Sequence, residues 1–293
     1  MDAFLGQVFT GLSVGSVLIL IALGLTFTFG QMNVINMAHG EFIMAGAYTA
    51  YVLQNLVGSG VSLVVALPVA FAIAGALGLV LELVLIRRLY GRPLDTLLVT
   101  WGVSLMLQQL ARDIFGAPNV QVRAPGWLGG SLHVAGASLS YSRIFIMGLV
   151  MVCVVGIWLF LTKMPQGGRM RAVMQNRQLA SCSGLKTHSI DRLTFFIGSG
   201  LAGVAGVALT LLGSTGPTLG TNYIVDAFLV VVVGGLGQLK GAVIAAISLG
   251  LLRSFVEFST EASFAKVAVF IAIVAFLQFR PQGLFVLKSR GLA

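Results

Sequence analysis

Long apolar stretches recur along the whole chain, separated by short polar or glycine-rich segments. Four of them are close to the roughly twenty residues that an α-helix needs to cross about 30 Å of hydrocarbon. They are Leu5–Phe29, Val61–Ile86, Ile144–Thr162 and Leu193–Leu212. The pattern predicts an all-α membrane protein, a polytopic transmembrane helix bundle formed as a single domain from residues 1–293.

Two regions break the apolar pattern in a similar way. They are "GQMNVINMAHGE" (Gly30–Glu41) and "GSTGPTLGTNYIVDAFLVVVVGGLGQLKG" (Gly213–Gly241), and in each a glycine-rich break is combined with an asparagine, an acidic residue and a new helix. Paired interruptions of this kind are typical of discontinuous helices around a midplane site, often within an internal repeat. With both breaks counted, we expect about nine spans, within a range of about eight to ten.

His39 and Glu41 stand out because they lie beside the first break in an otherwise apolar run. Charged side chains inside a membrane usually face the bundle interior or a watery cavity. One interpretation is a structural cap, in which Glu41 stabilises the start of the new helix and His39 bonds a neighbouring carbonyl. The other is that the break lines a translocation path, and the two interpretations are compatible.

Polar and small residues also repeat at helical spacing within the spans. Thr96, Thr100, Ser104, Gln108 and Arg112 follow one helix face, which either holds helices together or lines the path. Gly198, Ala202 and Gly206 form a ridge of small residues that predicts close helix packing. Arg253 and Glu257, four residues apart, are expected to pair.

The segment Gly116–Ser142 is polar, rich in glycine and partly alternating. It predicts an external loop with a small β-hairpin around Gly136. Such a loop either caps the bundle or docks an external partner.

Charge is sparse and unevenly placed. Only 9% of residues are charged and the net charge is +9, with thirteen of the eighteen Lys and Arg in segments that we place in the cytoplasm. This bias is a topology signal and does not indicate a nucleic-acid site. It places the N-terminus outside, where Asp2 and the lack of a basic start argue against a cleaved signal peptide, and the C-terminus in the cytoplasm.

Several motifs of soluble enzymes do not fit their surroundings here. "GLSVG" (Gly11–Gly15) matches a nucleophile elbow but lies in an apolar helix. His39, His133 and His188 are too scattered for a metal site, and no phosphate-binding P-loop occurs. We therefore expect no catalytic residue, no metal and no cofactor on this chain, and any use of ATP would belong to another subunit.

The basic loop of residues 163–192 is long for the interior side of a transporter. Helix-forming residues run from Arg169 to Ser183, and Gly184 is expected to end the helix. Ala180 and Gly184 give it a small-residue face. Such a helix can lie on anionic lipid or dock into a partner protein.

Five separated motifs together resemble one known family. They are "GLTFTFGQMNVINMAHGEFIMAGAY", "GRMRAVMQNRQLASCSGL", "GSGLAGVAGV", "IVDAFLVVVVGGLG" and "FRPQGLF". The chain resembles, over nearly its whole length, the membrane permease subunits of ATP-binding-cassette importers for branched-chain amino acids and urea. "TWGVSLMLQQLARDIFGAPNVQVRAPGWL" and "AVMQNRQLA" look closer to the urea branch, of the UrtB type.

The resemblance implies four kinds of partner besides membrane lipid. These are a second, homologous permease, two cytoplasmic ATPase subunits that use ATP and Mg²⁺, and an external binding protein that delivers the solute. It also implies that the basic loop engages the ATPase through Arg169, Arg171, Asn176, Ala180 and Gly184. Gln178 departs from the importer pattern, since an acidic residue is expected there.

We therefore expect a permease that imports urea, with branched-chain amino acids as the alternative substrate. Urea is neutral and offers N–H donors and one carbonyl acceptor, which carboxylates and amides can match. The candidate path residues are Asn33, Asn36, His39, Glu41, Gln109, Asn222 and Asp226. A passive channel for small neutral solutes would need no ATPase, and an intramembrane enzyme would turn over substrate as an isolated chain.

Overall fold

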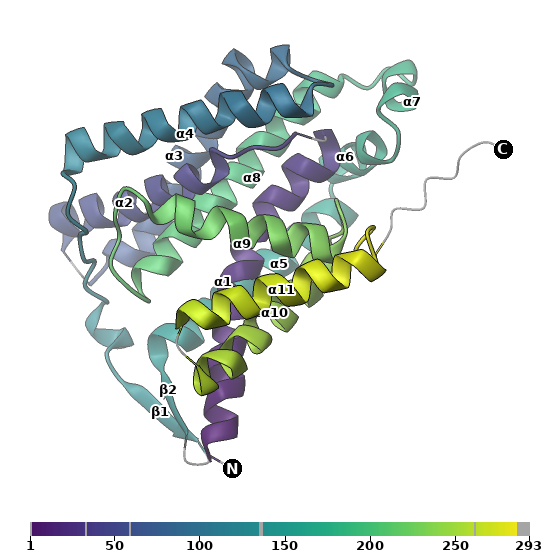
Figure 1. The fold of residues 1–293 in the computed structure, drawn as a ribbon. Helices are drawn as coiled ribbons and strands as arrows, with labels where there is room; N and C mark the ends of the chain where they lie inside the picture. The colour runs from purple at the N-terminus through teal and green to yellow at the C-terminus, as the bar shows by residue number, and fades with distance from the viewer. Residues whose placement is uncertain (1, 33, 59, 135–136, 261, 286–293) are drawn as a thin grey trace.

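The computed structural model describes all residues except 1, 33, 59, 135–136, 261 and 286–293 (Figure 1). Eleven α-helices and one hairpin make up the described residues. The helices are α1 Asp2–Met32, α2 His39–Val57, α3 Ser62–Val84, α4 Pro93–Phe115, α5 Tyr141–Lys163, α6 Pro165–Gln175, α7 Arg177–Cys182, α8 Thr187–Thr210, α9 Leu219–Gly234, α10 Leu239–Ser259 and α11 Ala262–Phe279. The hairpin strands are β1 Ser131–Val134 and β2 Ala137–Ser140, and short 3-10 turns cover Ile86–Arg88 and Gly126–Leu128.

Five of these helices are long and apolar enough to cross a membrane: α1, α3 with its 3-10 extension, α5, α8 and α10. Apolar stretches of α9 and α11 are shorter. The predicted all-α, polytopic membrane protein is thus confirmed. The number of spans stays a prediction, because α2 and α4 are not among the helices that are long and apolar enough.

Helices α1 and α8 form the centre of the bundle. The ridge of small residues on α8 permits the close packing that its spacing predicted. A Cβ at Gly198 would lie 2.8 Å from the carbonyl oxygen of Gly24 in α1, and Ala202 is fully buried. A Cβ at Gly206 would collide with the carbonyl oxygen of Ile43 in α2.

The segment that was expected to be an external loop caps one end of the bundle. Its hairpin is confirmed, with Ser131 opposite Ser140 in an antiparallel pair. Val120 and Thr215 exchange backbone hydrogen bonds of 2.7 and 2.8 Å, which tie the segment to the break before α9. Figure 1 shows the hairpin near the N-terminus and α6 and α7 toward the opposite end of α1.

The last described residues bind the end of α9. The backbone N–H of Leu284 donates to the carbonyl of Val233 at 2.8 Å, and that of Phe285 donates to the carbonyl of Gly234 at 3.3 Å. Gly235, with φ of +97°, ends the helix in a conformation that favours glycine. The tail therefore satisfies carbonyls that have no partner within the helix.

Candidate functional site

The first predicted break is present, since α1 ends at Met32 and α2 begins at His39. Asn36 and His39 are fully buried and Glu41 is 1% exposed. The Nε2 atom of His39 lies 3.2 Å from the carbonyl oxygen of Ile21 in α1, which confirms the predicted bond to a neighbouring carbonyl. Asn33 lies outside the described residues.

Glu41 connects two helices. Its Oε1 atom accepts hydrogen bonds from the Ser104 hydroxyl at 2.8 Å and the Gln108 amide at 2.9 Å, both on α4. It lies in the first turn of α2, where the helix dipole favours a carboxylate, but the bonds of the carboxylate go to α4 and not to the backbone of its own helix. Glu41 therefore does not cap the backbone of α2, because α4 supplies two side-chain donors within its reach.

The polar face of α4 is the face that contacts the break. Its buried residues are Thr96, Thr100, Ser104, Gln108 and Ala111. The predicted face is thus confirmed as buried except at its end, where Arg112 is exposed. The Thr100 hydroxyl accepts from the backbone N–H of Met37 at 3.0 Å, so α4 also holds the non-helical segment in place.

Gln109 lies on the other side of α4 and does not join this group. It is exposed and donates to Asp113 at 2.9 Å. Gln108 instead occupies the position that was expected for Gln109. The Gln108 amide also donates to the Thr221 hydroxyl of α9 at 3.0 Å. The four-residue spacing that placed Gln108 on the buried face was the signal for choosing it. We call Asn36, His39, Glu41, Ser104 and Gln108 the sealed cluster.

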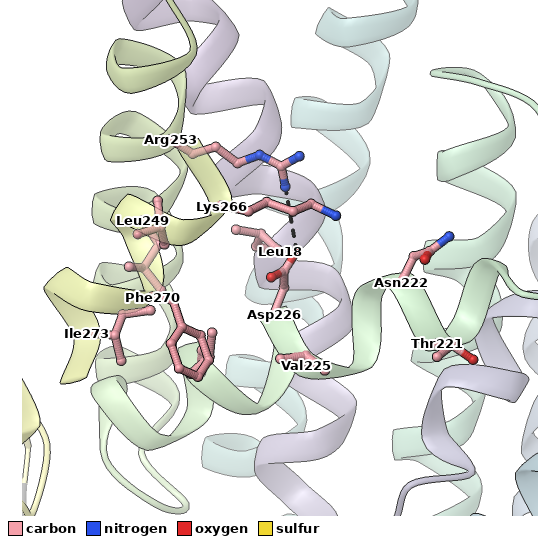
Figure 2. A pocket seen from close by; sticks show the side chains of 12 residues that line it. Leu18, Thr221, Asn222, Val225, Asp226, Leu249, Arg253, Lys266, Phe270 and Ile273 are labelled. Carbon is pink, nitrogen blue, oxygen red and sulfur yellow. Dashed lines mark ion pairs between the residues drawn. The ribbon is translucent and has the colours of Figure 1, made fainter. Parts of the chain in front are cut away.

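The second break leads to a different kind of site, which we call the α9 pocket (Figure 2). It is a cavity of about 290 Å³ between α1, α9, α10 and α11. Arg253 Nη1 lies 3.5 Å from Asp226 Oδ2, and these side chains are 23% and 26% exposed. Lys266 lines the same pocket from α11, and Asn222 lies one helical turn before Asp226 (Figure 2).

Arg253 has a second carboxylate partner. Its Nε atom donates to Glu257 at 2.7 Å, which confirms the predicted pair. The rest of the pocket wall is apolar and consists of Leu18, Val225, Leu229, Leu249, Val269, Phe270 and Ile273. Thr221 also lines the pocket, so the bond from Gln108 joins the two sites through α9.

The basic loop forms two helices, α6 and α7, where a single helix from Arg169 to Ser183 was expected. The helix breaks at Asn176, whose side chain accepts from the backbone N–H of Leu179 at 3.0 Å and thereby starts α7. Gly184 follows α7 with φ of +82°, as expected of a helix stop.

The five expected coupling residues differ in exposure. Arg169, Arg171, Asn176 and Gly184 are exposed, and their contact with an ATPase stays a prediction. Ala180 is only 6% exposed and packs into the core of this chain, because a helix as short as α7 must bury one face against the bundle. The small-residue face is thus partly occupied by the chain itself.

Arg177 is a residue that the sequence reasoning missed. Its guanidinium donates to both carboxylate oxygens of Asp191 at 2.9 and 2.5 Å, and Asp191, in α8, is fully buried. The amide of Gln31, next to the last residue of α1, donates to Asp191 at 3.2 Å. One carboxylate therefore ties α7 to α8 and to the end of α1.

Tyr90 completes this contact. We call Gln31, Tyr90, Arg177 and Asp191 together the Arg177 clamp. The guanidinium carbon of Arg177 lies 5.0 Å from the centre of the Tyr90 ring, and the Tyr90 hydroxyl donates to Glu82 at 3.0 Å. The hydrogen bonds that Arg177 donates to Asp191 raise the pKa of Arg177 above its usual value. Burial, followed by the charges of Asp191 and Glu82, raises the pKa of Tyr90.

Metal-binding chemistry has no support among the residues that the structure describes, since they contain no group of three or more His, Cys, Asp and Glu side chains suited to an ion. The site consists of broken helices, a charged pocket and a clamped basic loop. These features define the class as a polytopic membrane permease.

Comparison with known proteins gives the family. Residues 7–277 match the family described as "Branched-chain amino acid transport system / permease component". The chain belongs to this family.

Named relatives cover nearly the whole chain. The "High-affinity branched-chain amino acid transport system permease protein BraD" of Pseudomonas aeruginosa is 30% identical, over 96% of this chain and 95% of the relative. The corresponding protein LivH of Escherichia coli (strain K12) is also 30% identical, with the same coverage. LivM of the same strain is 27% identical over 91% of this chain and 67% of its own length. No solved structure matches the chain.

Proposed function

We propose that the chain is the permease subunit of an ATP-driven importer that moves branched-chain amino acids across the inner (plasma) membrane. The names of BraD and LivH support this substrate class, which was the alternative from the sequence. The expected urea branch gains no support from these names.

The partners follow from the same proposal. The chain resembles both LivH and LivM, which supports a pair of homologous permeases. Two ATP-binding subunits would bind ATP and Mg²⁺ on the side of α6 and α7, and a binding protein would deliver the solute on the side of the hairpin. The N-terminus then lies outside and the C-terminus in the cytoplasm, as the charge bias favours.

The observation that carries the ATP-driven mechanism is the Arg177 clamp. A movement of α7 by an ATPase would act on Asp191 in α8 and, through Gln31, on the end of α1 directly before its break. A bidentate pair between arginine and a carboxylate resists reorientation better than a single contact. The cytoplasmic loop is therefore connected to both central helices of the bundle.

Uptake by the reconstituted complex tests the function. With binding protein and ATP present, labelled leucine is expected to accumulate and labelled urea is not. Accumulation of urea alone would overturn the substrate class. Leucine flux that continues unchanged without ATP would instead indicate a passive channel.

A glycine substitution tests the coupling assignment. Gly184→Leu is strained at φ of +82°, at a cost of about 1–2 kcal/mol, although no neighbouring atom lies within 4 Å of an added Cβ. We expect normal folding and assembly but reduced uptake per ATP hydrolysed. Gly168→Leu is the matched control, since that position is helical and equally open. Equal uptake in both variants would remove Gly184 from the coupling contact.

A further inference from the structure

We infer that the α9 pocket binds an α-amino acid as a zwitterion, with its carboxylate on Arg253 and Lys266, its ammonium on Asp226 and its aliphatic side chain on the apolar wall. This inference rests on the proposed function and names the place where this subunit would contact the solute.

The charged side chains in the pocket are arranged so that a zwitterionic solute can replace the ion pair between Arg253 and Asp226. The 3.5 Å separation of Arg253 and Asp226 exceeds the usual N–H···O range of roughly 2.7–3.2 Å, so this pair is loose. Glu257 holds the Nε atom of Arg253 and leaves the two terminal nitrogens for another acceptor. A solute carboxylate can therefore take over the guanidinium while its ammonium takes over Asp226.

Lys266 adds the second cation. It lines the pocket from α11, whereas Arg253 comes from α10 (Figure 2). Two cations and one carboxylate facing the same space suit a ligand that carries both charges close together. The Asn222 amide, one turn away on α9, can donate to the carboxylate or accept from the ammonium.

Size and polarity fit a small amino acid with an aliphatic side chain. The volume of about 290 Å³ lies near the lower end of the roughly 300–1,000 Å³ range of ligand pockets. Val225, Leu249, Phe270 and Ile273 give the side chain an apolar surface. Urea has neither charge nor apolar surface, so it would leave the ion pair intact and the apolar wall unused.

Protection of a cysteine from a thiol reagent measures occupancy without transport. Val225 is 47% exposed and lines the pocket, so Val225→Cys is placed in an otherwise cysteine-free chain that carries Cys153→Ser and Cys182→Ser. The assembled complex in lipid nanodiscs, without binding protein, is treated with a charged maleimide. Leucine at ten times its dissociation constant should slow labelling about tenfold, and urea should not slow it.

Each charge has its own test in this assay. Asp226→Asn and Lys266→Met should each weaken leucine protection by about tenfold, because each removes a charge-assisted contact. Asp113→Asn is the matched control, since Asp113 bonds only the exposed Gln109 among its described neighbours. Leu132→Cys, on the hairpin and 44% exposed, should be labelled at a rate that leucine does not change.

The outcomes separate this inference from the proposed function. Uptake of leucine by the wild-type complex without protection of Val225→Cys would overturn the pocket assignment and leave the importer in place. Equal protection by leucine and urea, or protection that survives Asp226→Asn and Lys266→Met, would also overturn it. Failure of the wild-type complex to take up leucine would count against the proposed function instead.

Discussion

The sealed cluster and the α9 pocket arise from similar sequence patterns but differ in chemistry. Both combine a glycine-rich break with an asparagine and an acidic residue. Glu41 is 1% exposed and accepts from neutral donors on α4, whereas Asp226 is 26% exposed at its side chain, pairs loosely with Arg253 and shares its pocket with Lys266. The neighbouring helices therefore decide whether such a carboxylate is buried among neutral donors or lies in a pocket with cations.

The comparison assigns different roles to the two regions. In the sealed cluster, hydrogen bonds from Ser104 and Gln108 hold the start of α2 against α4. In the α9 pocket, a solute can replace one loose ion pair and keep every charge paired.

The largest expected effect is on stability, and it separates the two carboxylates directly. Glu41→Ala leaves two buried donors without their acceptor, at about 1–3 kcal/mol each. Asp226→Ala removes half of a partly exposed pair and should cost about 1 kcal/mol or less, since Arg253 keeps Glu257. Thermal unfolding of both variants in lipid nanodiscs measures the difference.

Glu41→Gln is the control for this prediction, since its amide oxygen can still accept from Ser104 and Gln108. It should retain most of the stability that Glu41→Ala loses. If Asp226→Ala unfolded at a lower temperature than Glu41→Ala, the assignment of structure to one region and recognition to the other would be reversed.

The next effect concerns the contact between the regions. Gln108→Ala removes the bonds to Glu41 and Thr221 and should cost about 1–3 kcal/mol. Gln109→Ala, on the exposed side of the same helix, should change stability by less than about 0.5 kcal/mol. Thermal unfolding is again the measurement, and equal losses in the two variants would mean that α4 does not connect the sites as described.

A third, smaller effect concerns the Arg177 clamp, which connects α7 to the end of α1 just before the sealed cluster. Arg177→Gln should lower leucine uptake per ATP hydrolysed by about tenfold, equivalent to about 1.4 kcal/mol. Arg177→Lys should recover only part of it, because lysine keeps the charge but lacks the planar fork. Lys186→Gln removes an exposed charge from the same loop and serves as the control. Unchanged coupling in Arg177→Gln would contradict the Arg177 clamp.

The smallest effect is a pH dependence at the clamp. Because the pKa of Tyr90 is raised in the folded protein, stability is unaffected by this group below about pH 10 and falls above it, where only the unfolded chain ionises. The unfolding temperature of Tyr90→Phe should therefore decline less between pH 9 and 11 than that of the wild type. Parallel declines would show that Tyr90 does not titrate in this way.

The sequence predicted those features that depend on local spacing. The buried face of α4, the small-residue ridge on α8, the hairpin and the Arg253–Glu257 pair all follow from residues three or four positions apart or from a short alternating run. Both helix breaks were also predicted, because glycine, proline and asparagine mark them directly.

Contacts between helices that are far apart in the sequence could not be predicted from local spacing. Nothing local links Arg177 to Gln31, or Arg253 to Asp226, since packing alone brings these helices together. The choice of Gln109 was a different error, because the four-residue spacing already placed its neighbour Gln108 on the buried face. Lys266 was missed because α11 carries no polar face of its own.

The tail that pairs with the end of α9 has a practical consequence for work on this protein. Leu284 and Phe285 share backbone hydrogen bonds with the helix that carries Asp226. A label attached at Leu284 or Phe285 would therefore act directly on the helix that carries Asp226. Assays of solute occupancy are better made without a label at these two positions, and such a label is better reserved for following α9 itself.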